Sequence, residues 1–367
     1  MRILSVVTLI SPTGEYGGPV RVALNQARAL REAGHHVTVA GATRGFEVPP
    51  TEFDGTPVRL FPAVTVLPGA GFAGLAAPGL QRWLRTTAGE FDVIHVHAAR
   101  DLVTLPAAAL ARRRGMPYVI QTHGMIDVSR NPLAVPLDSL LTRRVLRGAK
   151  VVFYLTEHER ADIEAVAAGI PQLQELPNGV PLSEPTVPSP RREVLYLARL
   201  APRKRPLTFV EAAAALTSEH PDVEFTLVGP DEGEAAAVRD LIARAGITDR
   251  VRWEGPLPPE QTIERMRHAS LYVLPSVDEP YPMSVLEAMS VGLPVIVTDS
   301  NGLAAAVEKV GSGIVVDASV AELTRAIGQL LDDPERARAM GAAGRDATRT
   351  DFGMPAIAAA LELAYSV

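Results

Sequence analysis

The chain has 367 residues, of which 47% are apolar and none is cysteine, and its formal net charge at pH 7 is −6. This length suggests two domains of ordinary size, each with a substantial core. The absence of cysteine excludes disulfides, thiolate metal sites and cysteine nucleophiles. The acidic balance gives no indication of nucleic-acid binding.

The charge is distributed unevenly. Residues 1–182 hold 18 Lys and Arg against 15 Asp and Glu, whereas residues 183–367 hold 18 against 27. Residues 1–7 read as a first core strand, because this short apolar run is not followed by a small-residue cleavage site. No apolar stretch reaches the about 18 residues needed to cross a membrane. We therefore expect a cytoplasmic protein, with peripheral membrane contact left open.

Apolar strand runs alternate with helical patterns from the N-terminus onward, which is typical of parallel α/β architecture. Strands are predicted in the first half at 3–9, 36–40, 58–61, 93–97, 118–122, 151–155 and 174–176. Helices are predicted at 19–33, 102–114, 137–147 and 157–168. Residues 63–80 are rich in Ala, Gly and Pro, and they predict a loop or a broken helix.

A proline-rich segment separates the two halves. Residues 181–190 contain four prolines and are the best linker candidate. A second series follows, with strands predicted at 194–197, 224–228, 251–254, 271–274, 294–298 and 313–316, and helices at 206–219, 232–245, 259–268, 283–290, 320–331 and 334–349. The pattern predicts doubly wound domains at 1–182 and 183–351, and the final helix, about 352–367, could pack back on the first domain.

Two glutamates eight residues apart mark the strongest candidate site. Glu279 falls in a loop after a predicted strand, and Glu287 falls about one turn inside the following helix. Ligands of open α/β sheets bind at the carboxyl ends of the strands. A random pair of this kind is more often an exposed loop acid and a helix-surface acid, but the flanking residues favour a site.

Four cations lie within seven residues at the end of the second half's first strand, namely Arg199, Arg203, Lys204 and Arg205. Arginine offers a planar fork to phosphate oxygens, and lysine offers a point charge. A solvated basic loop is the alternative for Arg203 and Arg205. Arg199 follows an apolar run directly, so it is expected to point into a cleft.

Glycines and histidines mark strand ends in the first half. Gly17 and Gly18 precede a predicted helix, where backbone amides can approach a phosphate, although the spacing fits neither a dinucleotide-binding nor a P-loop pattern and a plain turn is the alternative. His97 and His123 lie at two strand ends, and Gly124 allows a ligand to approach His123 closely. A lone strand-end histidine is more often structural, and no pattern indicates a metal.

Together these motifs suit a ligand with a diphosphate at its centre. Lys204 and Arg199 would neutralise the diphosphate. Glu287 could accept hydrogen bonds from a vicinal diol such as a ribose, and Glu279 could orient sugar hydroxyls.

At these residues the sequence resembles the retaining, metal-independent GT-B glycosyltransferases of family 4. The resemblance covers nearly the whole chain. The Glu279 and Glu287 pair, combined with the Arg199 and Lys204 segment, is specific, whereas the histidine strand alone is not. The remaining matching segments are residues 17–18, 28–37, 91–97, 122–124, 156–157, 177–180, 228–229 and 292–295.

The resemblance implies an α/β fold of two Rossmann-like doubly wound domains that face each other across a cleft. It implies transfer of a sugar from a nucleotide diphosphate sugar to an acceptor hydroxyl, with retention of configuration and without a metal or other cofactor. Catalytic roles are implied for His123, Arg199, Lys204 and Glu279. Donor contacts are implied for Gly17, Gly18, Arg199, Lys204, Gly229, Leu257, Glu279, Tyr281, Pro282, Met283, Ser284 and Glu287.

Three positions depart from the family pattern. Ala198 stands where glycine is frequent, and the added methyl is expected to be tolerated. Pro282 stands where the family commonly has glycine, and because proline has no N–H, one main-chain donor to the sugar is missing. Residues 301–305 lack an acid that is often present, and nothing in the sequence explains that change.

Two other readings remain open at this point. One is an epimerase with the same fold, which would convert the donor without an acceptor; a phosphorylase is disfavoured because the chain has only three lysines. The other is a catalytically silent sugar- or membrane-binding protein, with Arg143, Arg144, Arg147 and Lys150 as a basic helix face. The sequence does not indicate the donor sugar, the nucleobase, the acceptor or the oligomeric state.

Overall fold

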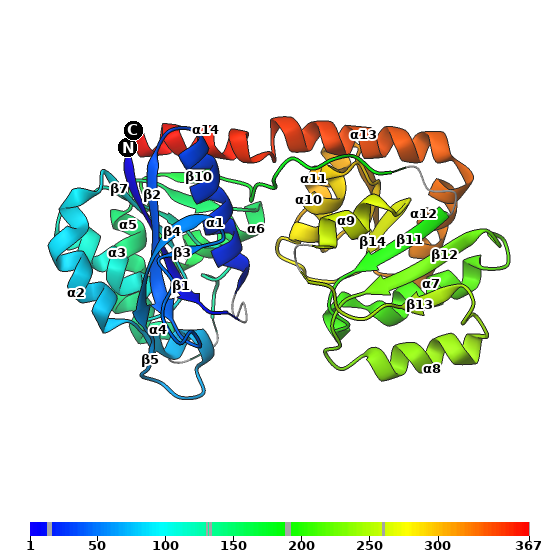
Figure 1. Cartoon of the computed structure of the whole chain (residues 1–367), viewed down its shortest axis with the longest axis horizontal. Coiled ribbons are helices and arrows are strands. Elements are labelled where there is room, and N and C mark those ends of the chain that lie inside the picture. Colours follow the sequence, from blue (N-terminus) through cyan, green and yellow to red (C-terminus); the bar gives the residue numbers. More distant parts are fainter. Residues whose placement is uncertain (13–16, 130, 132–133, 188–191, 259–260, 367) are drawn as a thin grey trace. The chain divides into compact units, whose positions relative to one another are not determined.

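The computed structural model describes the chain except residues 13–16, 130, 132–133, 188–191, 259–260 and 367. The predicted glycine loop before the first helix therefore falls largely outside the described residues. The chain forms two compact units, one made of Met1–Gly179 with Met354–Val367 and the other of Val180–Gly353. Each unit has its own parallel sheet flanked by helices (Figure 1).

The first unit is built on an eight-stranded sheet with the order β10-β9-β8-β7-β1-β2-β4-β3. Its pairs are parallel except for the edge pair of β3 and β4. The strands are β1 (Arg2–Ile10), β2 (His36–Thr43), β3 (Glu52–Phe53), β4 (Thr56–Pro62), β7 (Val93–His97), β8 (Tyr118–Gln121), β9 (Val152–Tyr154) and β10 (Leu173–Glu175). A separate small pair joins β5 (Val64–Thr65) to β6 (Leu75–Ala76).

Helices cover both faces of this sheet. They are α1 (Gly17–Glu32), α2 (Pro78–Thr87), α3 (Thr104–Arg113), α4 (Ala134–Leu137), α5 (Arg143–Gly148), α6 (Glu157–Val166) and α14 (Met354–Ser366), with short turns η1 (Gly71–Gly74), η2 (Ala88–Glu90) and η3 (Asp138–Thr142). Side chains of β1 alternate between two cores. Ile3 and Val7 pack with α1 and α14, whereas Leu4 and Val6 pack with α2, α3 and α5.

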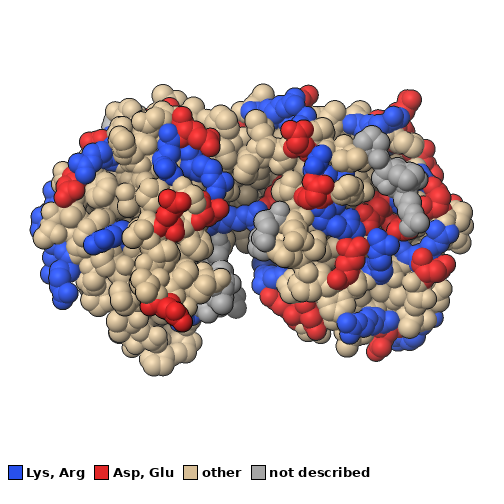
Figure 2. Space-filling view, viewed as in Figure 1, with Lys and Arg blue, Asp and Glu red and all other residues tan. Residues whose placement is uncertain are grey.

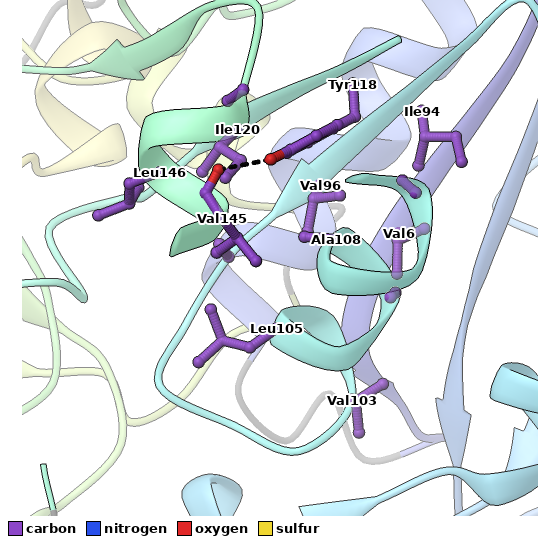
Figure 3. Packing of buried hydrophobic residues seen from close by; sticks show 14 of the residues in the cluster. Val6, Ile94, Val96, Val103, Leu105, Ala108, Tyr118, Ile120, Val145 and Leu146 are labelled. Atoms are coloured by element: carbon purple, nitrogen blue, oxygen red, sulfur yellow. Dashed lines mark hydrogen bonds between the residues drawn. The ribbon is translucent and has the colours of Figure 1, made fainter. Parts of the chain in front are cut away.

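The core between the sheet and α3 and α5 shows how a polar atom is accommodated there (Figure 3). Tyr118 of β8 is buried, and its hydroxyl donates to the carbonyl of Val145 in α5 at 2.7 Å. Burial raises the pKa of Tyr118 well above its ordinary value. The hydroxyl is therefore neutral and hydrogen-bonded, so its burial in the core costs little free energy.

The second unit is built on a six-stranded, fully parallel sheet with the order β13-β12-β11-β14-β15-β16. Its strands are β11 (Arg192–Leu197), β12 (Val223–Val228), β13 (Val251–Trp253), β14 (Leu271–Leu274), β15 (Val295–Thr298) and β16 (Gly313–Val316). Its helices are η4 (Pro202–Lys204), α7 (Pro206–Leu216), α8 (Ala235–Ala245), α9 (Thr262–Arg267), α10 (Met283–Ser290), α11 (Ala304–Val310), α12 (Val320–Asp332) and α13 (Pro334–Thr350).

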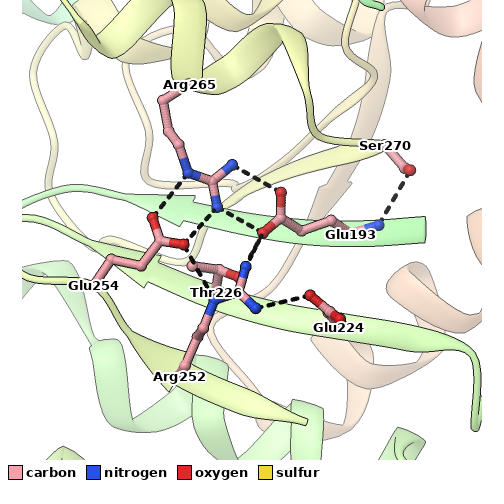
Figure 4. A network of polar contacts seen from close by, with 7 residues as sticks. All are labelled: Glu193, Glu224, Thr226, Arg252, Glu254, Arg265 and Ser270. Carbon is pink, nitrogen blue, oxygen red and sulfur yellow. Dashed lines mark hydrogen bonds and ion pairs between the residues drawn. The ribbon is translucent and has the colours of Figure 1, made fainter. Parts of the chain in front are cut away.

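A charged network ties the β13 edge of this sheet to α9 (Figure 4). The Arg265 guanidinium donates to both oxygens of the buried Glu193 carboxylate, at 2.8 and 2.6 Å, and to Glu254 at 2.9 Å. Burial opposes the charge, but these two carboxylates raise the pKa of Arg265. Arg252 adds contacts to Glu224 and Glu254. The network fixes the start of the segment that continues to Leu257.

The chain passes between the units after Gly179 and again after Gly353. The proline-rich segment predicted as the linker is instead fixed to the second unit over its described residues. The amide of Thr186 donates to Val291 at 2.8 Å, and Arg345 donates to the carbonyl of Ser183 at 2.9 Å. Residues 188–190 of the predicted linker lie outside the described part of the chain.

Most predicted elements are confirmed within a few residues, and two predicted helices differ from their expected course. The predicted helix at 137–147 is interrupted by the π turn η3. The predicted helix at 232–245 starts at 235, because Asp231 Oδ1 accepts from the amides of Gly233 and Ala235 at 2.8 and 3.1 Å. The sequence missed α2 and α11.

Figure 2 shows Lys and Arg side chains interspersed with Asp and Glu side chains on the visible face of both units. Within the described residues, no helix combines the length and the apolar character that crossing a membrane requires.

Candidate functional site

The strand order of the second sheet places two loops at a topological switch point. Strand β11 lies between β12 and β14. The chain leaves β11 towards β12 and leaves β14 towards β15, so the loops after β11 and β14 diverge from neighbouring carboxyl ends, which is where open α/β sheets bind their ligands. These loops, residues 198–205 and 275–282, carry the predicted residues Arg199, Lys204 and Glu279.

Lys204 and Glu279 meet at this switch point. The Lys204 Nζ donates to Glu279 Oε2 at 2.5 Å, and each residue is only 9% exposed. The Arg203 guanidinium lies 3.6 Å from the same carboxylate oxygen. The structure thus places two residues together that are 75 positions apart in the chain.

The surroundings of Lys204 do not fully stabilise the positive charge of its ammonium group. Burial lowers the pKa of Lys204, the neighbouring Arg203 and Arg199 charges lower it further, and the Glu279 carboxylate only partly offsets these effects. A desolvated cation flanked by two guanidinium groups gains from additional negative charge nearby. The electrostatics therefore favour an anionic ligand at this position.

The loop that carries Glu279 is held by its neighbours. The amide of Val277 donates to the Arg203 carbonyl at 3.0 Å, and the Gly302 amide donates to the Glu279 carbonyl at 2.8 Å. Asp278 adopts a positive φ of 50°, and its amide lies 3.2 Å from Ser300 Oγ. A Cβ on Gly302 would lie 1.8 Å from the Pro280 carbonyl oxygen. Only glycine fits this close approach of two loops.

Gly229 brings the end of β12 against the end of β11. Its φ is +147°, and a Cβ there would lie 2.0 Å from the Ala198 carbonyl oxygen. The Tyr196 hydroxyl donates to the Arg199 carbonyl at 3.0 Å, which fixes the backbone beside it. The Arg199 side chain is half exposed, and its Nη1 donates to Glu232 at 2.8 Å. An acid missed by the sequence interpretation therefore engages the predicted phosphate ligand Arg199.

Glu287 lies on α10 and is 6% exposed, so it is not a helix-surface acid. Burial, followed by the charges of Glu287 and Glu279, raises the pKa of Tyr272, whose hydroxyl lies 2.8 Å from Ser284 Oγ. Both predicted glutamates thus act electrostatically on one buried phenol. The pair belongs to one environment in the second unit.

The start of α10 is formed by the residues after Glu279. Pro282 is the N-cap residue and makes no side-chain capping bond. The first-turn amides of a helix, here at Met283 and Ser284, lack intrahelical partners. The half-buried Tyr281, Met283 and Leu257 pack against the same hydrophobic cluster. These predicted donor contacts therefore share one wall of the second unit.

The first unit has its own switch point between β1 and β7, where the predicted glycines follow β1, whereas His123 follows the next strand, β8. Gly17 is the first residue of α1, and Gly18 follows it. A Cβ on Gly18 would meet nothing within 4 Å. Gly18 thus carries no steric conflict among the described residues, and it lies at a helix N-terminus, a position that favours anions.

His123 belongs to a row of three histidines, of which His95 and His97 are buried and His123 is half-buried. Its Nε2 lies 2.8 Å from His97 Nδ1, the two rings stack with 5.1 Å between centroids, and His97 stacks on His95 at 4.4 Å. His95 Nδ1 lies 2.8 Å from the hydroxyl of Tyr365 in α14. Burial lowers the pKa of both His95 and His123 to about 3. The three rings are therefore neutral at pH 7, including His97, whose pKa burial also lowers.

We expect the histidine row to make the first unit sensitive to acid. Above pH 6.5 the rings are neutral in both states, but below it the unfolded chain binds protons that the folded chain takes up only near pH 3. Each of His95 and His123 therefore lowers the free energy of unfolding by about 2 kcal/mol at pH 5. Asp101 has the opposite effect. Burial raises its pKa to about 6, so between pH 6 and 3.8 the folded chain binds a proton that the unfolded chain does not, and the free energy of unfolding rises as the pH falls.

Urea unfolding at pH 7.5 and pH 5 measures this loss when it is followed by tryptophan fluorescence in a Trp253→Phe background, which leaves Trp83 of the first unit as the reporter. His95→Gln should lose about 2 kcal/mol less than the unmodified chain between the two pH values. The exposed His36 supplies the control, because His36→Gln should leave the loss unchanged. Equal losses in all three proteins would contradict the assigned role of burial.

Besides Glu232, two residues that shape the site could not be named from the sequence. Gly302 is conspicuous only once the Glu279 loop is seen against it. Glu159 had a local signal, since Thr156 and Glu159 match the spacing of a helix capping box, and the Thr156 side chain does cap α6. Its contacts with residues far away in sequence carried no signal. Among the described residues, no group of three or more acidic or histidine side chains is placed to hold a metal ion.

Comparison with known proteins adds independent evidence. Residues 17–179 match the glycosyl transferase 4-like domain, and residues 183–347 match the glycosyl transferases group 1 family. A D-inositol 3-phosphate glycosyltransferase of Frankia alni is 30% identical over 96% of this chain and 95% of its own length. A 2-deoxystreptamine glucosyltransferase of Streptomyces kanamyceticus is 30% identical over 84% of this chain and 85% of its own length.

Solved structures agree on the fold. HepE of Anabaena, in complex with UDP, superimposes with a TM-score of 0.78 at 19% identity and covers 100% of both chains. The predicted GT-B fold class is therefore confirmed. With both family models matched in order and relatives aligned over most of their length, the chain belongs to the group 1 glycosyltransferases and is a glycosyltransferase of the GT-B fold.

Proposed function

We propose that the protein transfers a sugar from a nucleotide diphosphate sugar to an acceptor hydroxyl, with retention of configuration and without a metal. The observation that carries this proposal is the buried Lys204 ammonium, held by Glu279 at 2.5 Å at the switch point of the second sheet. This ammonium is held in one position and shielded from water, which suits it to stabilise a diphosphate leaving group. The UDP bound to HepE and the sugar-transferring relatives support the same chemistry.

In the proposed reaction, the bond between the anomeric carbon and the phosphate oxygen breaks, and the acceptor oxygen bonds to that carbon on the same face. The acceptor proton moves to a phosphate oxygen of the leaving nucleoside diphosphate. Lys204 and Arg199 would stabilise the charge that develops on this leaving group, and the amides of Gly17 and Gly18 would donate to it. No protein nucleophile is required.

The other predicted residues would position the donor. Glu287 would accept from the ribose hydroxyls, and the main chain near Leu257 would meet the base. Glu279 has one oxygen bonded to Lys204, which leaves its other oxygen for a sugar hydroxyl. The first-turn amides of Met283 and Ser284 would supply donors that Pro282 cannot. His123, neutral at pH 7 because burial lowers its pKa to about 3, would contact the sugar as a neutral group.

Thermal unfolding with UDP, GDP, ADP and dTDP, each with and without EDTA, tests the proposed donor class. The matching nucleotide at about 100 times its Kd should add roughly 2.7 kcal/mol, with EDTA having no effect. The corresponding nucleotide sugars are then incubated with 1D-inositol 3-phosphate or 2-deoxystreptamine, and the anomeric configuration of the product is read by NMR. A product of inverted configuration, or conversion of the donor without any acceptor, would contradict the proposal.

Glu232 is expected to compete with the ligand for Arg199. Its carboxylate occupies Arg199 Nη1 at 2.8 Å, so a phosphate that binds this nitrogen must displace it. Glu232→Gln should therefore strengthen binding of the matching nucleoside diphosphate by a few fold, since exposed ion pairs are worth about 0.2–1 kcal/mol. Isothermal titration calorimetry measures the change, and Glu322→Gln, which breaks the exposed pair with Arg325 elsewhere in the second unit, serves as the control. Weaker binding by Glu232→Gln would show that Arg199 does not turn to the phosphate.

A further inference from the structure

Glu159 is a buried carboxylate that contacts the chain on both sides of His123. It lies in the first turn of α6 and is 5% exposed. Its Oε1 accepts from the Thr122 hydroxyl and from the Gly124 amide, both at 2.5 Å, while its Oε2 accepts from the Leu155 amide at 2.6 Å. Oε1 of Glu159 is therefore hydrogen-bonded to the residues immediately before and after His123.

The backbone of His123 needs such support. Its φ is +53°, in the left-handed region that costs a non-glycine residue roughly 1–2 kcal/mol. A residue is kept in such a conformation only when its surroundings determine it several times over. The hydrogen bonds from Thr122 and Gly124 to one carboxylate oxygen fix the turn, and His97 fixes the ring from the other side at 2.8 Å.

Helix capping alone does not account for these contacts. The Thr156 side chain already accepts from the Glu159 amide at 3.2 Å, and the Leu155 amide uses only Oε2 of Glu159. A cap would leave Oε1 exposed to solvent at the start of the helix. Here Oε1 accepts both of its hydrogen bonds from a loop more than 30 residues away in the sequence.

We propose that Glu159 is a positioning residue for His123, holding its backbone in the left-handed turn so that the imidazole has one orientation. The inference rests on the proposed function, in which His123 meets the transferred sugar. Glu159 itself touches none of the reacting atoms. Its carboxylate acts through the Thr122 and Gly124 hydrogen bonds, and its loss would let the turn relax and move the ring.

The decisive variant is Glu159→Gln, which keeps the size of the side chain but replaces one acceptor oxygen by an NH2 group. A single carbonyl oxygen cannot serve both the Gly124 and the Leu155 amides. The matched control is Glu157→Gln, because Glu157 lies two residues away in the same helix turn with its side chain 73% exposed. His123→Ala and the Glu159→Gln/His123→Ala double variant complete a cycle.

Two readouts separate positioning from general stability. The first is the NMR signals of the Gly124 amide and the His123 imidazole, which need no substrate. The second is kcat and the donor KM, with the donor and acceptor found active in the product assay. Glu159→Gln should shift both NMR signals and lower kcat about 10–100-fold with donor KM nearly unchanged, as a misplaced group does. In the His123→Ala background it should cause little further loss.

Each alternative outcome is informative. Unchanged imidazole signals and unchanged kcat in Glu159→Gln would overturn the proposal. A fall in kcat that is as large in the His123→Ala background would assign Glu159 a purely structural role and would also overturn it. If the unmodified protein transfers no sugar with any tested pair, the proposed function fails, and the imidazole signals alone then decide whether Glu159 positions His123.

Discussion

Lys204→Ala is expected to lower transfer by at least about 100-fold while leaving the fold intact, because it removes a preorganised charge-assisted contact worth roughly 3 kcal/mol to the leaving group. Binding of the matching nucleoside diphosphate should weaken in parallel. The replacement removes the ammonium partner of Glu279, a residue that is 9% exposed beside Lys204, so a modest loss of stability is also expected. Steady-state transfer rates and calorimetric binding measure the two effects.

The scarcity of lysine supplies the control. Lys309 is exposed at the end of α11, in the same unit, and Lys309→Ala should behave as the unmodified protein. Lys204→Met with Glu279→Gln removes both charges together, so it should fold without a stranded carboxylate and still lack activity. Normal turnover in Lys204→Ala would mean that this cation is not part of the site.

Gly302→Ala is expected to have the second large effect. The added Cβ would lie 1.8 Å from the Pro280 carbonyl oxygen and 3.2 Å from that of Glu279, so the Glu279 loop must move by more than an ångström. The hydrogen bond from the Gly302 amide to Glu279, 2.8 Å long, would be lost in the same movement. We expect a loss of roughly 1–3 kcal/mol in unfolding free energy and a large fall in kcat.

A glycine in the same unit provides the comparison. Gly328 lies within α12, where a Cβ would make only an ordinary contact with Leu216 at 3.5 Å. Gly328→Ala should raise stability by up to about 1 kcal/mol through helix propensity and leave transfer unchanged. Wild-type activity in Gly302→Ala would show that the Glu279 loop tolerates displacement and is not preorganised.

Local sequence patterns predicted the bounds of an element well where the segment is buried and its ends are marked in the sequence. The strands β7, β14 and β16 and the helix α10 match their predicted bounds. Strand β14 is an apolar run ended by Pro275 and Ser276, and the Gly292-Leu293-Pro294 segment stops α10. Helix α2 was missed because it begins at Pro78 within an Ala, Gly and Pro-rich stretch that reads as a loop. Helix α11 was missed because it has only seven residues, too few to show a helical period.

The candidate site was predictable to the extent that it depends on strand ends. Lys204 and Glu279 could be named from sequence because both follow buried strands, and the parallel order β11-β14 then brings their loops together. The partners that fix the geometry could not be named. The Glu232 contact with Arg199, the Gly302 approach to Pro280 and the hydrogen bond from Gly124 to Glu159 all join segments that are distant in sequence.

The proposed function depends on binding of the donor diphosphate by the Lys204 ammonium and the Arg199 guanidinium. A crystal structure of the protein with the nucleoside diphosphate that gives the largest thermal shift shows whether they bind it. We expect a phosphate oxygen within about 2.7–2.9 Å of Lys204 Nζ, with Arg199 released from Glu232. A diphosphate bound away from the loops after β11 and β14, with Lys204 still facing only Glu279, would contradict it.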